Sequence, residues 1–544
     1  MFYRTAILLI FSFITAFSCF GKSGYMFRIE LKDKGNPPHS IENPLDYLSE
    51  RAIERRSRQR IPIDSCDLPI DSVYLSQIKA TGVEIQTMSK WVKTVVVYLP
   101  DSTAVPLLEN LTFVDTLYCI WKGDLPESNG LKSVWSNDPK YADSRNSDEM
   151  METNLNVYGQ GYTQINMLNG DLLHNAGFRG KGMSIGVLDV GFQNCDQISA
   201  FKSDQIKEVK NFTHTKENPL RIAQSHGTSV LSCMLSNTSG IMVGTAPEAD
   251  YYLFKTEVEG EEHPIEEDYL IAAMEYADSI GIDVLNISLG YTVFDNSEMN
   301  HTYEELDGKT ILASRAASIA GDRGMLLFIS AGNEGNKPWR KITVPNDAEN
   351  IITVAAIKSD GVVTNFSSQG LTADKRVKPD LSSLGNAVAI IKSDGTVTTG
   401  NGTSYASPIL AGVGACLWQA LPQKTSKEII ALMQSVGDRV ANPDSIYGYG
   451  VPDMYKAYSS EILTTNSVLK KASLLFFDSR ENRLYVNCID CDNIELQIFD
   501  SLGQLVLEYR NRTASIDLCN LPRGIYFVCI NQKEKRVTQK IYKW

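Results

Sequence analysis

Residues 401–408, with the sequence NGTSYASP, open a long apolar stretch and predict the start of a helix over 403–420. Ser404 falls in the first turn of that helix, where unpaired backbone N–H groups and the positive end of the helix dipole stabilise an anion. Gly402 before it allows a substrate to approach the backbone closely. The pattern predicts a nucleophilic serine, although Thr403 or Ser404 at this place is also typical of a simple helix cap.

Two earlier segments put a carboxylate and an imidazole at the ends of predicted elements. Residues 183–191 (MSIGVLDVG) form an apolar strand that ends in Asp189, where a carboxylate orients a histidine without competition from solvent. His226 precedes Gly227 and begins a helical stretch, and imidazole is the side chain best suited to exchange protons near neutral pH. Taken singly, each segment is also typical of an ordinary turn.

A third segment, 330–336 (SAGNEGN), follows another predicted strand. The amide of Asn333 can donate to an oxyanion that develops during acyl transfer, although an Asn- and Gly-rich turn is the simpler interpretation. Asp189, His226, Asn333 and Ser404 each stand at a strand end or a helix start. Their joint occurrence is far more specific than any one of them.

The region 160–460 alternates short apolar strands with helical stretches. Such alternation predicts βαβ units, an α/β fold and a doubly wound, mostly parallel sheet. In sheets of this kind, reactive groups collect where strands end and helices begin. The expected strands are 183–188, 251–254, 284–289, 325–330 and 351–356, and the expected helices are 269–280, 311–320 and 403–420.

The order Asp, His, Asn, Ser and the GTSxAxP core at 402–408 resemble the subtilisin-like serine proteases. This resemblance implies that Ser404 attacks the peptide carbonyl and that His226 is general base and then general acid. It also implies that Asp189 holds the imidazole in the correct tautomer. Supporting matches within 182–457 are SLG at 288–290, FSS at 366–368, KPDL at 378–381 and YGxG at 447–450.

The resemblance extends to the groups around the triad. It implies that Asn333 and the backbone N–H of Ser404 form an oxyanion hole. Val190 and Ser229 depart from the family pattern, but neither change removes a proton-transfer group. The resemblance further implies that substrate binds as an extended strand along the backbones of Ser288, Leu289, Gly290, Ala331 and Gly332.

The N-terminal region reads as a signal peptide followed by a separate unit. A basic Arg4, an apolar run and small residues predict a signal peptide over 1–21 and hence export, with Cys19 as an alternative lipoprotein site. Residues 22–150 show a small α+β pattern that ends in a polar linker. By position, this unit resembles the inhibitory propeptides of such proteases. The alternative is an adhesive or exosite module that stays attached.

The C-terminal region, 467–544, has alternating strands with turn signals, which predicts a small antiparallel β-sandwich. IFDSLGQLV at 498–506 and LPRGIYF at 521–527 resemble the sorting domains of the type nine secretion system in Bacteroidetes. The resemblance implies an outer-membrane secretion machinery as partner and an extracellular or cell-surface location. A generic β-sandwich appendage is the alternative.

Composition narrows the possible partners. The formal charge of −13 and pI near 5.1 argue against nucleic acid, because phosphate binding needs a positive surface. The acidic stretch 257–268 either favours basic residues in substrates or is a solvated face. Four of the ten cysteines, Cys488, Cys491, Cys519 and Cys529, predict buried thiols or one disulfide more readily than a zinc site.

We therefore expect a secreted serine endopeptidase that cleaves proteins or peptides through a triad and an acyl-enzyme. No cofactor is expected for the chemistry, and no motif supports a structural calcium ion, although one is possible. The main alternative is a catalytically silent surface adhesin or scaffold that keeps the fold. A peptide-ligating or ester-hydrolysing enzyme with the same site is another.

Overall fold

The computed structural model describes residues 22–125 and 157–462, and in the C-terminal part residues 475–478, 482–486, 495–510, 515–532 and 535–543. By its contacts the chain divides into two compact units, Met1–Ala457 and Tyr458–Trp544, each described by itself. The expected signal peptide and most of the expected linker lie outside the described residues. Within the described ranges, no helix combines the length and the apolar character needed to cross a membrane.

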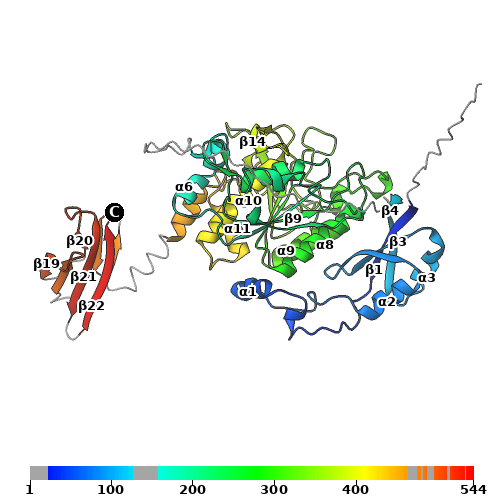
Figure 1. The fold of residues 1–544 in the computed structure, drawn as a ribbon, viewed down its shortest axis with the longest axis horizontal. Coiled ribbons are helices and arrows are strands. Elements are labelled where there is room, and N and C mark those ends of the chain that lie inside the picture. The colour runs from blue at the N-terminus through cyan, green and yellow to red at the C-terminus, as the bar shows by residue number, and fades with distance from the viewer. Residues whose placement is uncertain are drawn as a thin grey trace, which may run out of the picture. The chain divides into compact units, whose positions relative to one another are not determined.

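A seven-stranded sheet forms the centre of the first unit (Figure 1). Its strand order is β13-β12-β11-β10-β5-β9-β6, and all neighbours pair in parallel. Most of these strands are buried on both faces, so they read as nearly continuous apolar runs in the sequence. The strands are β5 (Ser184–Asp189), β6 (Ile206–Asn211), β9 (Asp250–Lys255), β10 (Val284–Ile287), β11 (Leu326–Ser330), β12 (Ile352–Ile357) and β13 (Leu381–Leu384).

Helices cover both faces of this sheet. Helices α8 and α9 pack together on one face, where they share a core with Leu285 and Ile287 of β10. Helix α10 packs on the other face, where Ser407 donates to Asn286 of β10. Successive side chains of a strand point to opposite faces, so the sheet is doubly wound. The helices of this part are α5 (Tyr162–Asn166), α6 (Gly170–Asn175), α7 (His226–Leu235), α8 (Ile265–Ile280), α9 (Leu312–Asp322), α10 (Thr403–Ala420) and α11 (Ser426–Ser435).

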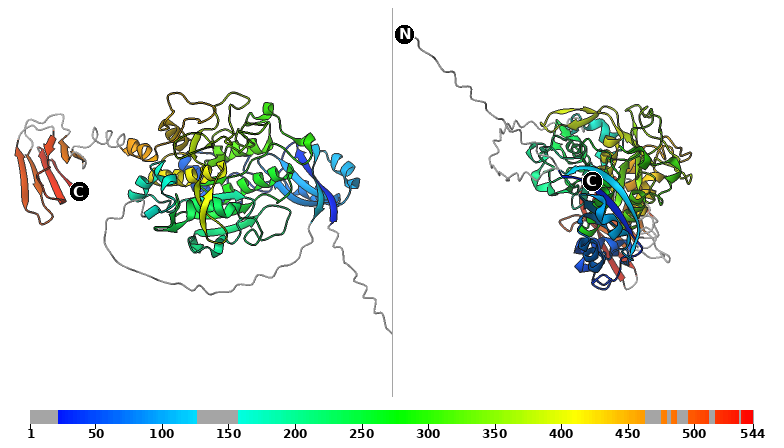
Figure 2. Two further views of the ribbon diagram at one scale, coloured as in Figure 1. Left: turned by 90° about the horizontal axis from the view of Figure 1, so that it is seen from above. Right: turned by 90° about the vertical axis from the view of Figure 1, so that its right-hand side faces the viewer.

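The N-terminal part, residues 22–125, is a four-stranded antiparallel sheet in the order β2-β3-β1-β4. One face packs on its own helices, and the other face, with Met26, Val96 and Trp121, packs on Tyr269 of α8. Figure 2 shows this sheet beside the central part. Its elements are β1 (Lys22–Leu31), α1 (Glu50–Gln59), α2 (Ser72–Ala80), β2 (Glu84–Ser89), β3 (Thr94–Leu99), α3 (Val105–Glu109) and β4 (Val114–Leu125).

The second unit contains two antiparallel sheets, β16-β17-β20 and β19-β18-β21-β22. Leu484 and Ile516 from the first sheet share one core with Ile498 and Val528 from the second, as in a β-sandwich. The strands are β16 (Leu475–Asp478), β17 (Arg483–Val486), β18 (Glu495–Phe499), β19 (Leu505–Arg510), β20 (Ser515–Asp517), β21 (Gly524–Gln532) and β22 (Lys535–Lys543).

The expected fold class is confirmed, and the differences from expectation have local causes. Strand β6 was not expected, because its sequence, IKEVKN, lacks an apolar pattern. Helix α8 begins at Ile265 rather than at residue 269, because its first turn is acidic and does not show in apolar periodicity. The expected strand 284–289 ends at Ile287, which leaves Ser288 and Leu289 in the following loop. Two hairpins, β7 (Asn237–Thr238) with β8 (Met242–Val243) and β14 (Val388–Ile391) with β15 (Val397–Gly400), were also not expected.

Candidate active site

Asp189 and His226 meet at the carboxyl end of the central sheet. Asp189 is the last residue of β5 and is fully buried, and His226 is the first residue of α7. The imidazole Nδ1 lies 2.8 Å from Asp189 Oδ1 and 3.1 Å from Oδ2. The backbone N–H of Val190 also donates to Oδ1 at 2.9 Å, which fixes the carboxylate. About a third of the His226 side chain stays exposed.

Glycine at position 227 allows this contact. A Cβ atom there would lie 2.5 Å from the Gly191 carbonyl oxygen and 2.9 Å from Asp189 Cβ. Both distances are shorter than packed atoms tolerate, so any larger residue would push α7 away from the end of β5. The His-Gly pair of the sequence is therefore a packing requirement as well as a motif.

Asp189 controls the protonation of His226. Burial lowers the pKa of His226, but the charge of Asp189 and the hydrogen bond to its carboxylate outweigh burial, so the pKa lies above the ordinary 6.5. His174 of α6 shows the opposite balance. Burial lowers its pKa to about 3, and its Nδ1 lies 2.8 Å from the Tyr158 hydroxyl. His226 is thus tuned to exchange protons, while His174 stays neutral in the core.

Ser404 lies in the first turn of α10 and is largely buried. Its hydroxyl donates to the Ser288 carbonyl at 3.4 Å, and the Ser288 hydroxyl donates back to the Ser404 carbonyl at 2.9 Å. The ring of Tyr405, the next residue, has its centroid 6.0 Å from that of His226. The first turn of α10 therefore lies beside both His226 and the loop after β10.

A buried polar chain holds this helix start against the sheet. Ser407 donates to Asn286 Oδ1 at 2.8 Å, and Asn286 Nδ2 donates to the Ser288 hydroxyl at 3.0 Å. Each of these groups is satisfied, so the chain rigidifies the position of Ser404. Sequence analysis did not single out Asn286 or Ser407. Asn286 could have been noticed, because it is a polar residue within the apolar run VLNI.

Asn333 reaches the same helix start from the loop after β11. Its Oδ1 accepts from the Thr403 N–H at 3.0 Å and from the Thr403 hydroxyl at 3.1 Å. The Thr403 hydroxyl in turn accepts from the Gly332 N–H at 3.2 Å. Because the amide oxygen is held in this way, the amide nitrogen is oriented to donate elsewhere.

The loops after β10 and β11 approach each other over Thr343. A Cβ at Gly290 would lie 2.1 Å from Thr343 Oγ1, and a Cβ at Gly332 would lie 2.8 Å from its Cγ2. Gly332 also has φ of 102°, a conformation that favours glycine. Ser288 and Ala331 are buried, Leu289 is half-buried and Gly290 is exposed. Sequence analysis did not identify Thr343, because nothing in its local pattern marks it.

The acidic stretch 257–268 is buried at both ends, while Glu259 and Glu262 in its middle are exposed. Glu266, Glu267 and Asp268 are all at most 3% exposed, and Glu257 binds the Tyr291 hydroxyl. Burial raises the pKa of Glu257 and of Glu266. Arg28 of β1 donates to Asp268 from two nitrogens, so the N-terminal part neutralises one end of the stretch.

Metal ligands and disulfides can be assessed only for the described part of the chain. There, no group of three or more His, Cys, Asp or Glu side chains has an arrangement that could hold a metal ion. Cys519 is exposed and Cys529 is buried. The other two cysteines for which buried thiols or one disulfide were predicted, Cys488 and Cys491, lie outside the described residues.

Three family models match successive parts of the chain. The Subtilase family model matches residues 180–450, which contain Asp189, His226, Asn333 and Ser404. The chain belongs to the subtilase family. A Peptidase S8 propeptide domain of Bacteroidota matches residues 26–132 of this subtilase, and a secretion system C-terminal sorting domain matches 480–543.

Curated relatives agree with this assignment. Subtilisin E of Bacillus subtilis strain 168 is 26% identical over 296 residues, which are 54% of this chain and 70% of the relative. The subtilisin of Bacillus pumilus is 25% identical over 296 residues, 54% of this chain and 97% of the relative. Serine protease AprX of B. subtilis is 27% identical over 301 residues, 50% of this chain and 65% of the relative. Among solved structures, MycP1 without its N-terminal propeptide aligns with 54% of this chain and 96% of its own at 21% identity and a TM-score of 0.44.

The family models and the curated relatives establish what kind of protein the subtilase is. It is a secreted serine-type endopeptidase, made with a propeptide and a C-terminal sorting domain and located at the cell surface or outside the cell. The silent adhesin or scaffold is not favoured. Subtilases need no cofactor for their chemistry.

Replacing Asp189 by Asn is expected to lower the pKa of His226 below 6.5. Burial then acts on the imidazole without an opposing negative charge. Histidine resonances followed by NMR across pH in both proteins measure the change, and His174 serves as an internal reference that should not move. A His226 pKa that stays above 6.5 in the variant would contradict this account.

Proposed function

We propose that Asp189, His226 and Ser404 are the catalytic triad of this endopeptidase. The observation that carries the proposal is the 2.8 Å contact between Asp189 and His226, at the sheet edge where the first turn of α10 presents Ser404. In this assignment His226 removes the proton of the Ser404 hydroxyl as that oxygen attacks the substrate carbonyl. His226 then protonates the leaving amine. In the second half of the reaction, His226 takes a proton from the water that attacks the acyl-enzyme and returns a proton to the Ser404 oxygen.

Asp189 would hold the imidazole in the tautomer that accepts at its outer nitrogen, and would stabilise the imidazolium that forms. The base acts only in its neutral form. Since the pKa of His226 lies above 6.5, we expect hydrolysis to fall as pH drops through that value.

We further propose that Asn333 and the backbone N–H of Ser404 bind the oxyanion of the tetrahedral intermediate. Support comes from the two hydrogen bonds that fix the Asn333 amide oxygen on Thr403 and leave its nitrogen as donor. A donor oriented in advance stabilises developing charge without reorganisation.

The substrate backbone is proposed to lie between the loops after β10 and β11. Ser288, Leu289 and Gly290 would bind it on one side, and Ala331 and Gly332 on the other. Support comes from their approach over Thr343 and from the mutual hydrogen bonds of Ser288 and Ser404. Protein and peptide substrates fit this mode, because main-chain binding tolerates many side chains.

The division of the chain is likewise a proposal. We assign a signal peptide to 1–21, a propeptide to 22–150, the peptidase to 160–460 and the sorting domain to 467–544. Processing in the linker would release the propeptide, and the sorting domain would engage an outer-membrane secretion machinery. Among the described residues, no cluster of three or more His, Cys, Asp or Glu side chains supports a structural calcium ion.

Replacing Ser404 by Ala should reduce hydrolysis of casein on the order of 10⁴-fold or more, because the nucleophile is lost while binding remains. Purified wild type and variant are compared by release of soluble peptides, and unfolding curves check that the variant is folded. N-terminal sequencing should show processing in the wild type only. Undiminished hydrolysis by the folded variant would refute the triad.

Replacing Asn333 by Ala is expected to lower kcat about 100- to 1000-fold with little change in KM, since the lost donor acts mainly in the transition state. Asn336→Ala is the matched control, because Asn336 is an exposed residue of the same loop. Steady-state kinetics on one peptide substrate measure both variants. Equal kcat values for the two would exclude Asn333 from the oxyanion hole.

Deleting residues 467–544 should retain the protease in the periplasm of its native host, because the signal that the secretion machinery reads is then absent. Immunoblots of periplasmic, surface and medium fractions measure the distribution, and Ser404→Ala in the full-length chain controls for effects of activity. Unchanged appearance of the shortened chain at the surface or in the medium would defeat the sorting role.

A further inference from the structure

The N-terminal part touches the central part at a place distant from its own sheet. Residues 32–71 form an excursion between β1 and α2, here called the arm, and it carries helix α1. In Figure 1, α1 lies apart from the sheet of β1 to β4 and against the central part. The backbone N–H of Ser49, which caps α1, donates to the Ser279 carbonyl at 2.8 Å.

Two adjacent arginines of α1 are buried on one carboxylate of α8. Arg55 and Arg56 are at most 1% exposed, and Asp278 is fully buried between them. Arg55 binds Asp278 Oδ1 and the Ile282 carbonyl, while Arg56 binds Asp278 Oδ2 at 2.6 Å and Asp67 of the arm at 3.0 Å. Buried charges of this kind are tolerated only when paired, so loss of either partner is severely unfavourable.

Around this pair the arm reaches the ends of two further helices. Gln59 donates to the Gly324 carbonyl after α9 at 2.7 Å and accepts from the Ser426 N–H of α11 at 2.8 Å. Arg323 of the central part binds Asp64 of the arm at 2.8 Å. The interface therefore spans the ends of α8, α9 and α11.

The central part is shaped to receive α1. A Cβ at Gly281 would lie 2.7 Å from the Ala52 nitrogen, and a Cβ at Gly324 would lie 2.6 Å from Gln59 Nε2. Both glycines have positive φ, where other residues are strained. The close approach of the α1 backbone thus depends on Gly281, while Gly324 leaves room for the Gln59 side chain.

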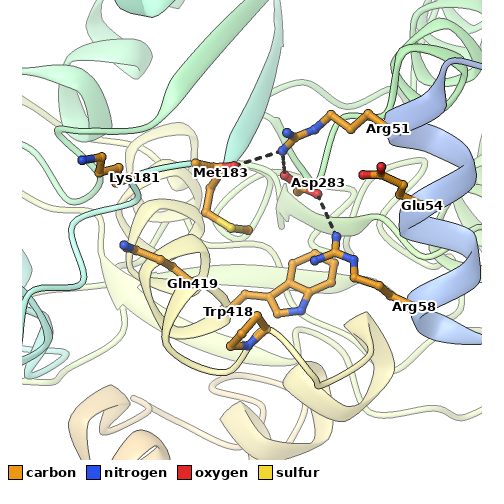
Figure 3. Close-up of a pocket in the computed structure, with 10 residues that line it drawn as sticks. Arg51, Glu54, Arg58, Lys181, Met183, Asp283, Trp418 and Gln419 are labelled. Carbon is orange, nitrogen blue, oxygen red and sulfur yellow. Dashed lines mark hydrogen bonds and ion pairs between the residues drawn. The ribbon is translucent and has the colours of Figure 1, made fainter.

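Beyond this contact the surface opens into a cavity of about 310 Å³ (Figure 3). Arg51 and Arg58 form ion pairs with Asp283, which lines the cavity, and Trp418 also lines the cavity. The Arg58 side chain is 52% exposed and lies 3.8 Å from Asp283. It is therefore a weak, solvated contact on the same helix as the buried pair.

This contact lies at the opposite edge of the sheet from the catalytic site. Asp283 accepts from the N–H of Ser184 at 3.0 Å, and Ser184 is the first residue of β5, whose last residue is Asp189. At about 3.3 Å per residue, the five steps of β5 separate the two ends by roughly 17 Å. A ligand in the cleft therefore does not compete for this surface.

We propose that the central part carries a second binding site, separate from the cleft, for a helix with two adjacent arginines. Its occupant is α1 of the propeptide. Asp278 is the buried anion of the site, and the carbonyl of Ile282 and the surfaces at Gly281 and Gly324 complete it. This proposal rests on the proposed function of the N-terminal part as a removable propeptide. It follows that the propeptide stays bound after the linker is cut, even when substrate fills the cleft.

The test uses the full-length Ser404→Ala chain with a recognition sequence for an added site-specific protease in the linker. After that cut, the dissociation rate of the N-terminal fragment is measured from the immobilised remainder. Replacing Arg55 and Arg56 by Met should raise this rate about 100-fold or more, as when one side of a buried charge pair is removed. Arg58→Met is the matched control and should change the rate less than about threefold. Equal rates for the double variant and the control would overturn the proposal.

A second measurement needs no substitution in the interface, in case the double variant does not fold. The cut Ser404→Ala chain receives excess peptide substrate, and hydrogen exchange is followed along α1 and β4. Continued protection of α1 is expected, and its loss on filling the cleft would overturn the proposal. The added protease makes the cut, so neither result depends on the triad, whose failure would appear as hydrolysis by Ser404→Ala.

Discussion

The hydrogen bond between Asp189 and His226 is the interaction on which the catalytic geometry depends. It requires the end of β5 and the start of α7 to lie in direct contact, which only a glycine at position 227 permits. It also opposes the effect of burial on the imidazole and keeps its pKa above the ordinary value. One contact thus sets both the position and the protonation of the proposed base.

The parallel sheet positions the other groups of the proposed site relative to Asp189 and His226. Its carboxyl edge brings Asp189 to the loops that carry Ser288 and Asn333, and α10 brings Ser404 across one face. On the other face, α8 covers the sheet, and the N-terminal part contacts this helix near both of its ends through Arg28 and Arg55. Catalysis and binding of the N-terminal part can therefore use different surfaces of one scaffold.

Several features of the fold were predictable because they leave a local pattern. Helix α10 begins and ends as expected, since its apolar run is long and Gly402 marks its start. Strand β6 was not predictable, because it is polar and is held by its parallel pairing with β9. The acidic first turn of α8 was not predicted as part of the helix. Its carboxylates are buried because they meet partners such as Arg28, which lie far away in the sequence.

By itself, the sequence determined the residue types of the site, their order and the alternation that predicts a doubly wound sheet. Each of these features shows as a pattern of residues close together in the sequence, as in the GTSxAxP core around Ser404. Only the tertiary structure decided that Thr343 lies beneath two glycines, that Asn286 supports the start of α10, and that Arg55 is buried on Asp278. Such contacts join residues distant in the chain, and their energy depends on burial, which no local pattern encodes.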